Sequence, residues 1–320
     1  MSTSDADSQP CAGGPGRPGV VGPDGVIVED ITCRRCGYNL RGLGENGRCP
    51  ECGTAVGLSI HGDLLRFAEP AWVEKLARGM ELILVGIVTG IVGGCVGGGI
   101  SAAGTPQSQA AGTLVILLSG LLSLVGAWIL TTPDPSGIGE QRFVNARKVV
   151  RAGLIAGLAG QLINLVLPDS RSGPLFALAI VAATVCGLAG AVGTYAQYLY
   201  IERLAERIPD ARLARLARFL RWGYSIVLGV STLIGGIAAF YVVRSGPAAA
   251  GPGIAATLSG FGVILGVAGC AFGLGVLVMS IACIVLYIRA RRAFREQAEL
   301  ARATWAAAAG GRAGGWEEGG

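Results

Sequence analysis

Charged residues are scarce in this chain. Only 15% of its 320 residues are Asp, Glu, Lys or Arg, whereas 52% are hydrophobic and the mean hydropathy is +0.57. Five long segments contain no charged residue: residues 82–133, 152–168, 172–201, 222–243 and 245–288. Such a composition excludes an ordinary soluble globular protein of this length and indicates an integral membrane protein.

Catalytic signatures are also lacking. The sequence contains no HExxH, GxSxG or phosphate-binding GxxxxGK[ST] pattern, and its single histidine is His61. The apolar segments carry no ionisable side chain of the kind that proton-coupled transporters place at membrane depth. We therefore expect a protein that is not an enzyme.

The apolar segments are long enough for helices that cross a bilayer, which needs about 20 apolar residues. Turn-forming residues at 104–109 divide the first segment into two. The sequence thus predicts an all-α polytopic membrane protein with six transmembrane helices. The expected spans are residues 82–102, 111–131, 149–168, 174–200, 222–243 and 256–288.

The basic residues predict the orientation of these spans. Of the 26 Lys and Arg residues, all but Arg171 and Arg244 flank the spans on one side. Because positive residues favour the cytoplasmic side, both termini are expected in the cytoplasm. The same basic residues are expected to contact anionic lipid headgroups of the bilayer.

Outside the spans, composition divides the chain into further parts. We expect a disordered N-terminal tail at 1–30, a metal-binding ribbon at 31–57, an amphipathic linker helix at 58–81, a six-helix domain at 82–288 with a cytoplasmic amphipathic helix at 210–221, and a basic, flexible tail at 289–320.

Two groups of residues within the spans suggest helix contacts. A stripe of glycines recurs every four residues at Gly86, Gly90, Gly94 and Gly98. Such stripes let helices approach closely, either within one bundle or in a homo-oligomer. A polar pair, Gln161 and Asn164, is expected to hydrogen-bond a neighbouring helix, with a substrate contact as the alternative.

The segment 210–221 alternates basic and apolar residues in a helical pattern. Its basic residues are Arg212, Arg215, Arg218 and Arg221. We expect them to face lipid headgroups, with a partner-docking surface as the alternative. Asp210 is expected to cap this helix, and Tyr198, Tyr224 and Tyr287 lie near cytoplasmic span ends, where amphipathic rings favour the interface.

The only specific chemical motif is a pair of CxxC sequences. Cys33 and Cys36 form the first pair, and Cys49 and Cys52 form the second, with twelve residues between the pairs. This spacing is typical of a site in which four thiolates hold one Zn²⁺. Because all four positions are filled by protein, the metal is expected to be structural.

Three alternatives to this interpretation remain. Iron could replace zinc, because the two CxxCG knuckles resemble those of rubredoxins as well as zinc ribbons. A disulfide pair is disfavoured in the cytosol. Nucleic acid is a weak alternative partner, because Arg34, Arg35 and their basic neighbours lack interleaved aromatic residues.

The run CRRCGYNLRGL at 33–43, closing with GRCPECG at 47–53, resembles the N-terminal zinc ribbon of a group of uncharacterised bacterial multi-pass membrane proteins. The resemblance implies metal binding by the four cysteines and a bacterial inner-membrane location. It implies no activity.

Three functions are compatible with these features. The favoured one is an anchor, sensor or scaffold whose cytosolic ribbon docks a protein partner. The alternatives are a permease or channel for a neutral solute that the ribbon regulates, and an iron redox module tethered to the membrane.

Overall fold

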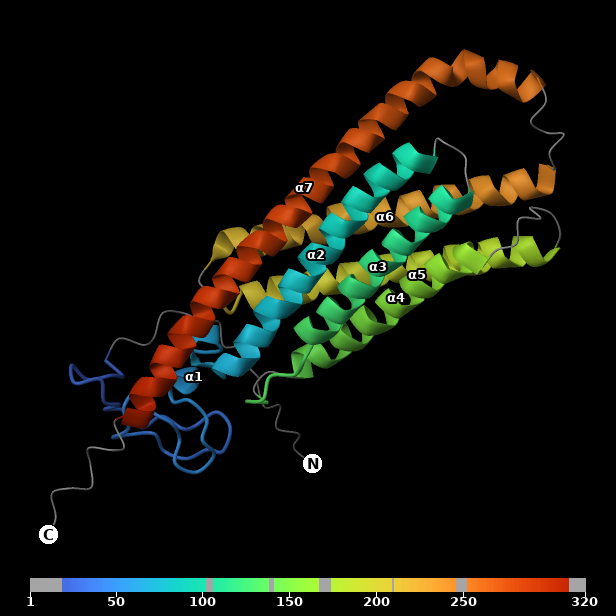
Figure 1. The fold of residues 1–320 in the computed structure, drawn as a ribbon. Helices are drawn as coiled ribbons and strands as arrows, with labels where there is room; N and C mark the ends of the chain where they lie inside the picture. Colours follow the sequence, from blue (N-terminus) through green and yellow to red (C-terminus); the bar gives the residue numbers. More distant parts are fainter. Residues whose placement is uncertain are drawn as a thin grey trace, which may run out of the picture. The chain divides into compact units, whose positions relative to one another are not determined.

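The computed structural model describes residues 19–101, 106–137, 141–166, 174–208, 210–245 and 252–310, and some side chains at helix ends within these ranges are not described. The described residues form seven α-helices and one short 3-10 helix, with no extended strand. In chain order the helices are α1 (Gly57–Ile60), η1 (Leu65–Phe67), α2 (Pro70–Ser101), α3 (Pro106–Leu130), α4 (Gln141–Val166), α5 (Pro174–Ala205), α6 (Ala211–Ser245) and α7 (Pro252–Gly310) (Figure 1).

The chain folds into two compact units. The first, here called the ribbon unit, comprises Met1–Val73, Asp134–Gly139 and Glu296–Gly320. The second, the helix unit, comprises Glu74–Pro133 and Glu140–Arg295. Thus the first part of α2 and the last part of α7 belong to the ribbon unit, while the remainder of both helices belongs to the helix unit.

Four helical segments are long and apolar enough to cross a membrane: Pro70–Gly93, Leu175–Ala205, Ala211–Ile237 and Leu274–Ala306. A shorter apolar segment occupies Leu114–Leu130. Each of the six expected spans overlaps one of the helices from α2 to α7. The chain therefore has the apolar helices of a membrane protein, and four of them reach spanning length within the described residues.

The linker region differs from the expected amphipathic helix at 58–81. Only the short α1 and η1 form before Pro70, where α2 begins and continues without interruption to Ser101. Proline suits the first turn of a helix because its missing N–H would have no helical partner there. After Pro70 no residue breaks the helix, so the expected linker helix is the first part of α2.

Two further expected boundaries also differ from the structure. The helix α6 starts at Ala211, so residues 211–221 are its first turns rather than a separate surface helix. Helix α7 extends to Gly310, and Phe294, Ala298 and Ala301 on it are buried. The expectation of a flexible tail from residue 289 is therefore wrong as far as Gly310, because an apolar face stabilises this segment as a helix.

Glycines set the spacing between neighbouring helices of the helix unit. Gly153 and Gly157 on α4 lie against Gly190 and Gly193 on α5, so closely that a Cβ at Gly153 would overlap the backbone of Gly193. Small residues let two helix backbones approach and gain dispersion contacts where no hydrophobic driving force acts between them. Helix α5 also packs along α6.

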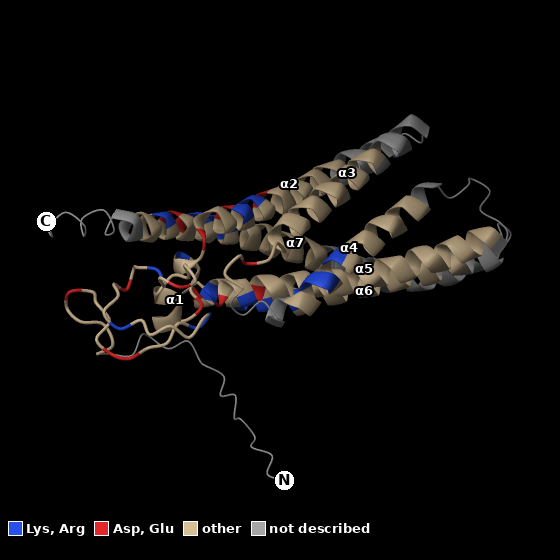
Figure 2. Ribbon diagram, turned by 90° about the horizontal axis from the view of Figure 1, so that it is seen from below, with Lys and Arg blue, Asp and Glu red and all other residues tan. Residues whose placement is uncertain are grey.

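Charged residues of α5 and α6 gather where one helix ends and the next begins (Figure 2). Glu202 near the end of α5 is buried, and its two carboxylate oxygens each accept a hydrogen bond, from Nε of Arg218 and from an Nη of Arg221, both at 2.7 Å. Asp210 caps α6 as expected, since its carboxylate accepts the backbone N–H of Arg212 at 2.9 Å.

Candidate metal centre

The two CxxC sequences fold into two equivalent tight turns. In the first, the Cys33 N–H donates to the Tyr38 carbonyl at 2.7 Å, and the Gly37 N–H donates to the Cys33 carbonyl at 2.9 Å. In the second, Cys49 and Gly53 make the corresponding bonds, with Thr54 and Cys49 as acceptors. Each turn is flanked by an antiparallel bridge. This repetition makes the ribbon a pair of knuckles that present their sulfurs in the same way.

Glycine is required at one position of each knuckle. Gly37 has φ +78° and Gly53 has φ +70°, in the left-handed region that side chains with a Cβ rarely adopt. Each of these glycines directly follows the second cysteine of its pair. The backbone can therefore turn back around the sulfurs immediately after that cysteine.

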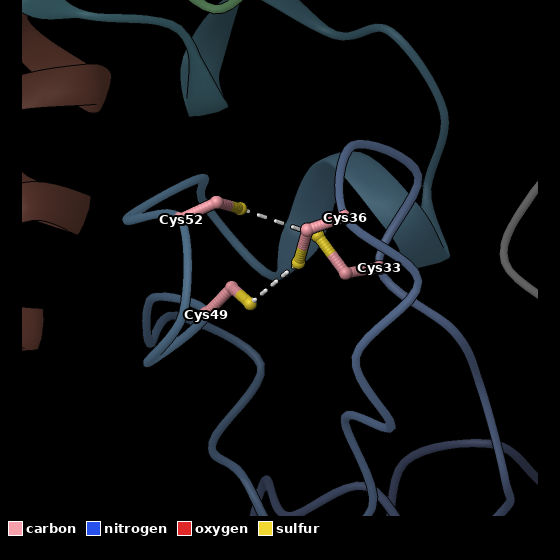
Figure 3. A group of neighbouring side chains, drawn as sticks. All are labelled: Cys33, Cys36, Cys49 and Cys52. Carbon is pink, nitrogen blue, oxygen red and sulfur yellow. Dashed lines mark hydrogen bonds between the residues drawn. The ribbon is translucent and has the colours of Figure 1, made fainter.

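The knuckles bring all four thiols together (Figure 3). The sulfur atoms of Cys33, Cys36, Cys49 and Cys52 all lie within 4.8 Å of one another. Across the knuckles, Sγ of Cys33 lies 3.6 Å from Sγ of Cys52, and Sγ of Cys36 lies 3.5 Å from Sγ of Cys49. A disulfide would need about 2.0 Å, whereas a tetrahedral metal with bonds of about 2.3 Å separates its sulfurs by about 3.8 Å. The geometry thus fits a four-thiolate metal site.

The thiols differ in how easily they ionise. Burial disfavours the thiolate of Cys52, but the hydroxyl and backbone of Thr54 together with the neighbouring thiols outweigh burial and lower its pKa to about 6. The Thr54 hydroxyl oxygen lies 3.2 Å from Sγ of Cys52. For Cys36, the backbone N–H of Tyr38 favours the thiolate, but desolvation and the other three thiols raise its pKa to about 12. The contact with Thr54 therefore favours the thiolate form of Cys52, which is the form that binds a metal.

A small apolar core surrounds the knuckles. Val20, Ile27, Leu40 and Val56 are buried with Cys33 and Cys49. Residues 19–30 thus belong to the ribbon, so the expected boundary at residue 31 is wrong and the ribbon begins earlier. The backbone bridges of Val21 with Ile27 and of Val26 with Gly44 tie this first segment to the loop between the knuckles. Residues 1–18 lie outside the described residues.

The ribbon arginines have individual contacts. Arg41 pairs with Asp30 at 3.4 Å, both exposed, and a guanidinium N–H of Arg34 donates to the Leu58 carbonyl at 3.3 Å. The Arg48 guanidinium lies over the Trp305 ring, 3.7 Å from its centroid. Their positive charge would offset part of the negative charge of a metal held by four thiolates. The same arginines also hold segments of the ribbon unit together through these contacts.

His61 lies apart from the thiols. Its Nε2 lies 2.5 Å from a carboxylate oxygen of Glu45, and its ring stacks on Phe67 with centroids 5.6 Å apart. These contacts hold α1 and η1 against the loop between the knuckles. His61 is a structural residue of the ribbon unit in this arrangement.

The other predicted site residues lie in the helix unit. Gly86 and Gly90 face α3, where Ser119 donates a hydrogen bond to the Gly86 carbonyl at 2.7 Å. Gly94 and Gly98 lie on α2, and Asn164 lies on α4. The surroundings of these three residues are outside the described part of the structure. The amide oxygen of Gln161 lies beside Gly120 of α3. The described part of the glycine stripe thus packs within one chain.

The four arginines of the expected headgroup surface are not equivalent. Arg212 and Arg215 are exposed, whereas Arg218 and Arg221 bind Glu202. The Arg221 side chain is only 17% exposed and also lies near the rings of Tyr195 and Trp222. Two of the four therefore hold α6 to α5, and a lipid-facing role is left to Arg212 and Arg215.

A buried polar cluster in the helix unit was missed from the sequence. The Gln197 amide donates to the Tyr287 hydroxyl at 2.8 Å, and the Tyr198 hydroxyl lies 3.0 Å from Sγ of Cys283. Tyr198 and Tyr287 are buried, although their positions near span ends favour the membrane interface. No sequence signal separates a tyrosine that turns inward from one that faces lipid, because both lie at the same depth on a helix.

Comparison with known proteins adds no assignment. No protein family, curated protein or solved structure matches this chain.

Proposed function

We propose that this protein is an integral membrane anchor or scaffold whose ribbon unit binds one structural Zn²⁺ and docks a protein partner in the cytoplasm. The observation that carries the proposal is the convergence of four thiols on one point, with every tetrahedral position supplied by the chain. A closed site leaves no position for a substrate, so the metal would serve to shape the ribbon.

Zinc is preferred to iron because of the residues that surround the thiols. Four thiolates in tetrahedral geometry suit both metals, so the surroundings must decide between them. The buried cluster that contains Cys33 and Cys49 is aliphatic, and Tyr38, the one aromatic residue in the sequence between Ile31 and Ser59, is 40% exposed. The described ribbon residues therefore lack an aromatic core like that of rubredoxins.

The helices and the charges support a location in a membrane. We infer six spans formed by α2 to α7, with both termini and the ribbon in the cytoplasm of a bacterial inner membrane. The four spanning segments and the clustering of Lys and Arg at one side of the expected spans support this topology. Reporter fusions test it: a phosphatase after residue 104 should be active and one after residue 310 inactive. The reverse pattern would contradict the inferred orientation.

Elemental analysis tests the metal directly. We expect about one zinc per chain in the detergent-purified protein, and none after Cys49→Ser with Cys52→Ser. The matched control is Cys186→Ser, which removes a half-buried thiol of α5 outside the cluster. If the protein contains iron and absorbs visible light, the scaffold proposal would give way to a redox function. If the wild-type protein contains no metal, neither the zinc scaffold nor the iron redox function would hold.

Partner docking needs a separate measurement. We expect at least one cytosolic protein to co-purify with the wild-type chain and with Cys186→Ser, and to be lost with the double cysteine variant. Direct binding of that protein to the purified chain would then be measured. Identical co-purifying proteins in all three samples would contradict docking through the ribbon, whatever metal it holds.

A further inference from the structure

One end of the helix pair α3 and α4 carries positive charge beside an exposed tryptophan. Trp128 lies in the last turn of α3 and is 47% exposed. The guanidinium of Arg151, on α4, lies over the Trp128 ring at 4.3 Å from its centroid. Lys148 lies one turn before Arg151 on α4 and is exposed. An aromatic ring and two cations therefore share one surface of the helix unit.

Arg151 is held in place while part of its guanidinium stays free. Its Nε–H donates to the Thr131 hydroxyl and an Nη2–H donates to the Thr131 carbonyl, both at 3.0 Å. The residue is partly exposed, and its other N–H groups donate to no acceptor among the described residues. A guanidinium that is already fixed loses little freedom when it binds a ligand, and its planar fork suits the oxygens of a phosphate.

The charge of this surface is not neutralised within the described part of the chain. Lys148 forms neither an ion pair nor a hydrogen bond there, and Arg151 contacts no described carboxylate. Arg221 of α6 differs, because its guanidinium donates to the buried carboxylate of Glu202. An external anion at Lys148 and Arg151 would therefore meet two cations without displacing a described carboxylate.

Apolar side chains continue from this surface along both helices. The helices run antiparallel, since Gly120 lies against Leu158 while Trp128 lies against Arg151. Their exposed apolar residues recur at helical intervals, as expected of faces that meet acyl chains. These residues are Leu114, Leu118, Leu121 and Val125 on α3, and Ile155 and Leu162 on α4. The pair thus presents cations at one end and apolar surface beyond them, which matches the order of groups in a phospholipid.

We propose that this surface binds one phospholipid with a net negative headgroup. The phosphate accepts hydrogen bonds from the free N–H groups of Arg151 and from the Lys148 ammonium. The Trp128 ring lies at the membrane interface, and the acyl chains lie along the exposed residues of α3 and α4. A headgroup that carries its own cation is disfavoured beside Lys148 and Arg151. The inference rests on the proposed membrane location, but it needs neither the metal nor a protein partner.

Lipid titration followed by native mass spectrometry tests the site in the full-length chain. Phosphatidylglycerol and phosphatidylcholine with the same acyl chains are added separately to the detergent-purified protein. We expect the first phosphatidylglycerol to bind about tenfold more tightly than phosphatidylcholine, and Lys148→Gln with Arg151→Gln to remove this preference. Lys148→Gln alone should reduce the preference about threefold. Because Lys148 contacts no described polar group, this single variant decides the outcome if the double variant does not fold.

The matched control removes two exposed arginines from another helix. Arg212→Gln with Arg215→Gln lowers the charge of the chain by the same amount and should change the preference by less than about twofold. An equal loss in both double variants would show attraction by net charge alone and would overturn the proposal. A thermal midpoint measured for each variant shows whether the helix unit has kept its fold.

Photolabelling places the lipid on the helices. Phosphatidylglycerol with a diazirine in one acyl chain is irradiated on the wild-type protein, which is then digested with trypsin. We expect label in the peptides 79–142 and 152–171, which contain the exposed faces of α3 and α4, and less in the α6 peptide 222–244.

Three results would overturn the inference. They are label mainly in the α6 peptide, displacement of the lipid by soluble inorganic phosphate, and equal affinity for the two lipids. If reporter fusions show the proposed topology while the lipids bind equally, this inference fails and the proposed function stands.

Discussion

The ribbon unit and the helix unit are stabilised by different interactions. The ribbon has few apolar residues, and its turns are fixed by backbone hydrogen bonds around four thiols. The helix unit has long apolar helices whose backbones satisfy their own hydrogen bonds and whose glycines allow close packing. From this comparison we expect that removing a metal from the thiols would unfold the ribbon while the helices of the other unit remain formed.

The largest expected effect is on the ribbon after metal removal. A structural zinc contributes about 10–16 kcal/mol of apparent binding free energy in small zinc-binding peptides. We expect Cys33→Ser with Cys36→Ser, or a strong chelator, to abolish hydrogen-exchange protection at residues such as Leu40 and Val56. Protection in α4 and α5 should persist. Loss of protection in both units together would contradict their independence.

The second effect concerns the ion pairs of Glu202. The variant Glu202→Ala leaves Arg221, which is largely buried, without its carboxylate partner, and breaking a buried pair costs about 3–5 kcal/mol. Because the Arg218 side chain is 58% exposed, the loss there is smaller. We expect a lower thermal midpoint in detergent, with unchanged zinc content. The exposed Glu206, changed to Gln, is the control, and equal destabilisation by both variants would contradict a specific role for Glu202.

The third effect sharpens the role of glycine in the helix unit. A methyl group at Gly153 would overlap the backbone of Gly193, so Gly153→Ala should destabilise the unit by about 1–3 kcal/mol. A methyl group at Gly235 meets nothing within 4 Å, and Gly235→Ala should be neutral or slightly stabilising through helix propensity. Thermal unfolding followed by circular dichroism measures both. A tolerated Gly153→Ala would show that α4 and α5 are farther apart.

The smallest effect is on the pH at which the ribbon releases its metal. The Thr54 hydroxyl helps to lower the pKa of Cys52, which favours the thiolate over the protonated thiol. With Thr54→Val the pKa rises, protons compete better with the metal, and release should occur about 0.5–1 pH unit higher. A zinc-binding dye in an acid titration measures the midpoint. Thr32→Val, at an exposed ribbon position, should not move it, and a downward shift in Thr54→Val would reverse the assigned role of the hydroxyl.

Runs without charged residues located the helices better than the helix ends. The six expected spans all fall on long helices, because runs without charge are recognisable residue by residue. The helix ends were wrong where amphipathic segments continue a span, as at residues 70–81 and 289–310. No proline lies at either junction between a polar segment and its span, and a single glycine, Gly79, does not end α2, so each helix continues through the junction.

The candidate metal centre was predictable because its ligands are close in sequence. Each CxxC pair is fixed by one local turn, and the glycine after it reports the backbone conformation that the turn needs. The contribution of Val20 and Ile27 was not predictable, because their segment is rich in glycine and proline and its burial depends on pairing with the loop before Cys49.

The sequence by itself determined the apolar helices and the identity of the four clustered thiols, since both depend on composition or spacing over a few residues. Tertiary structure decided which polar groups meet. Glu202 binds Arg218 and Arg221, and Gln197 binds Tyr287, across separations of up to 90 residues. Such contacts depend on the rotation of each helix about its axis, which side-chain packing fixes and which no local pattern in this chain specifies.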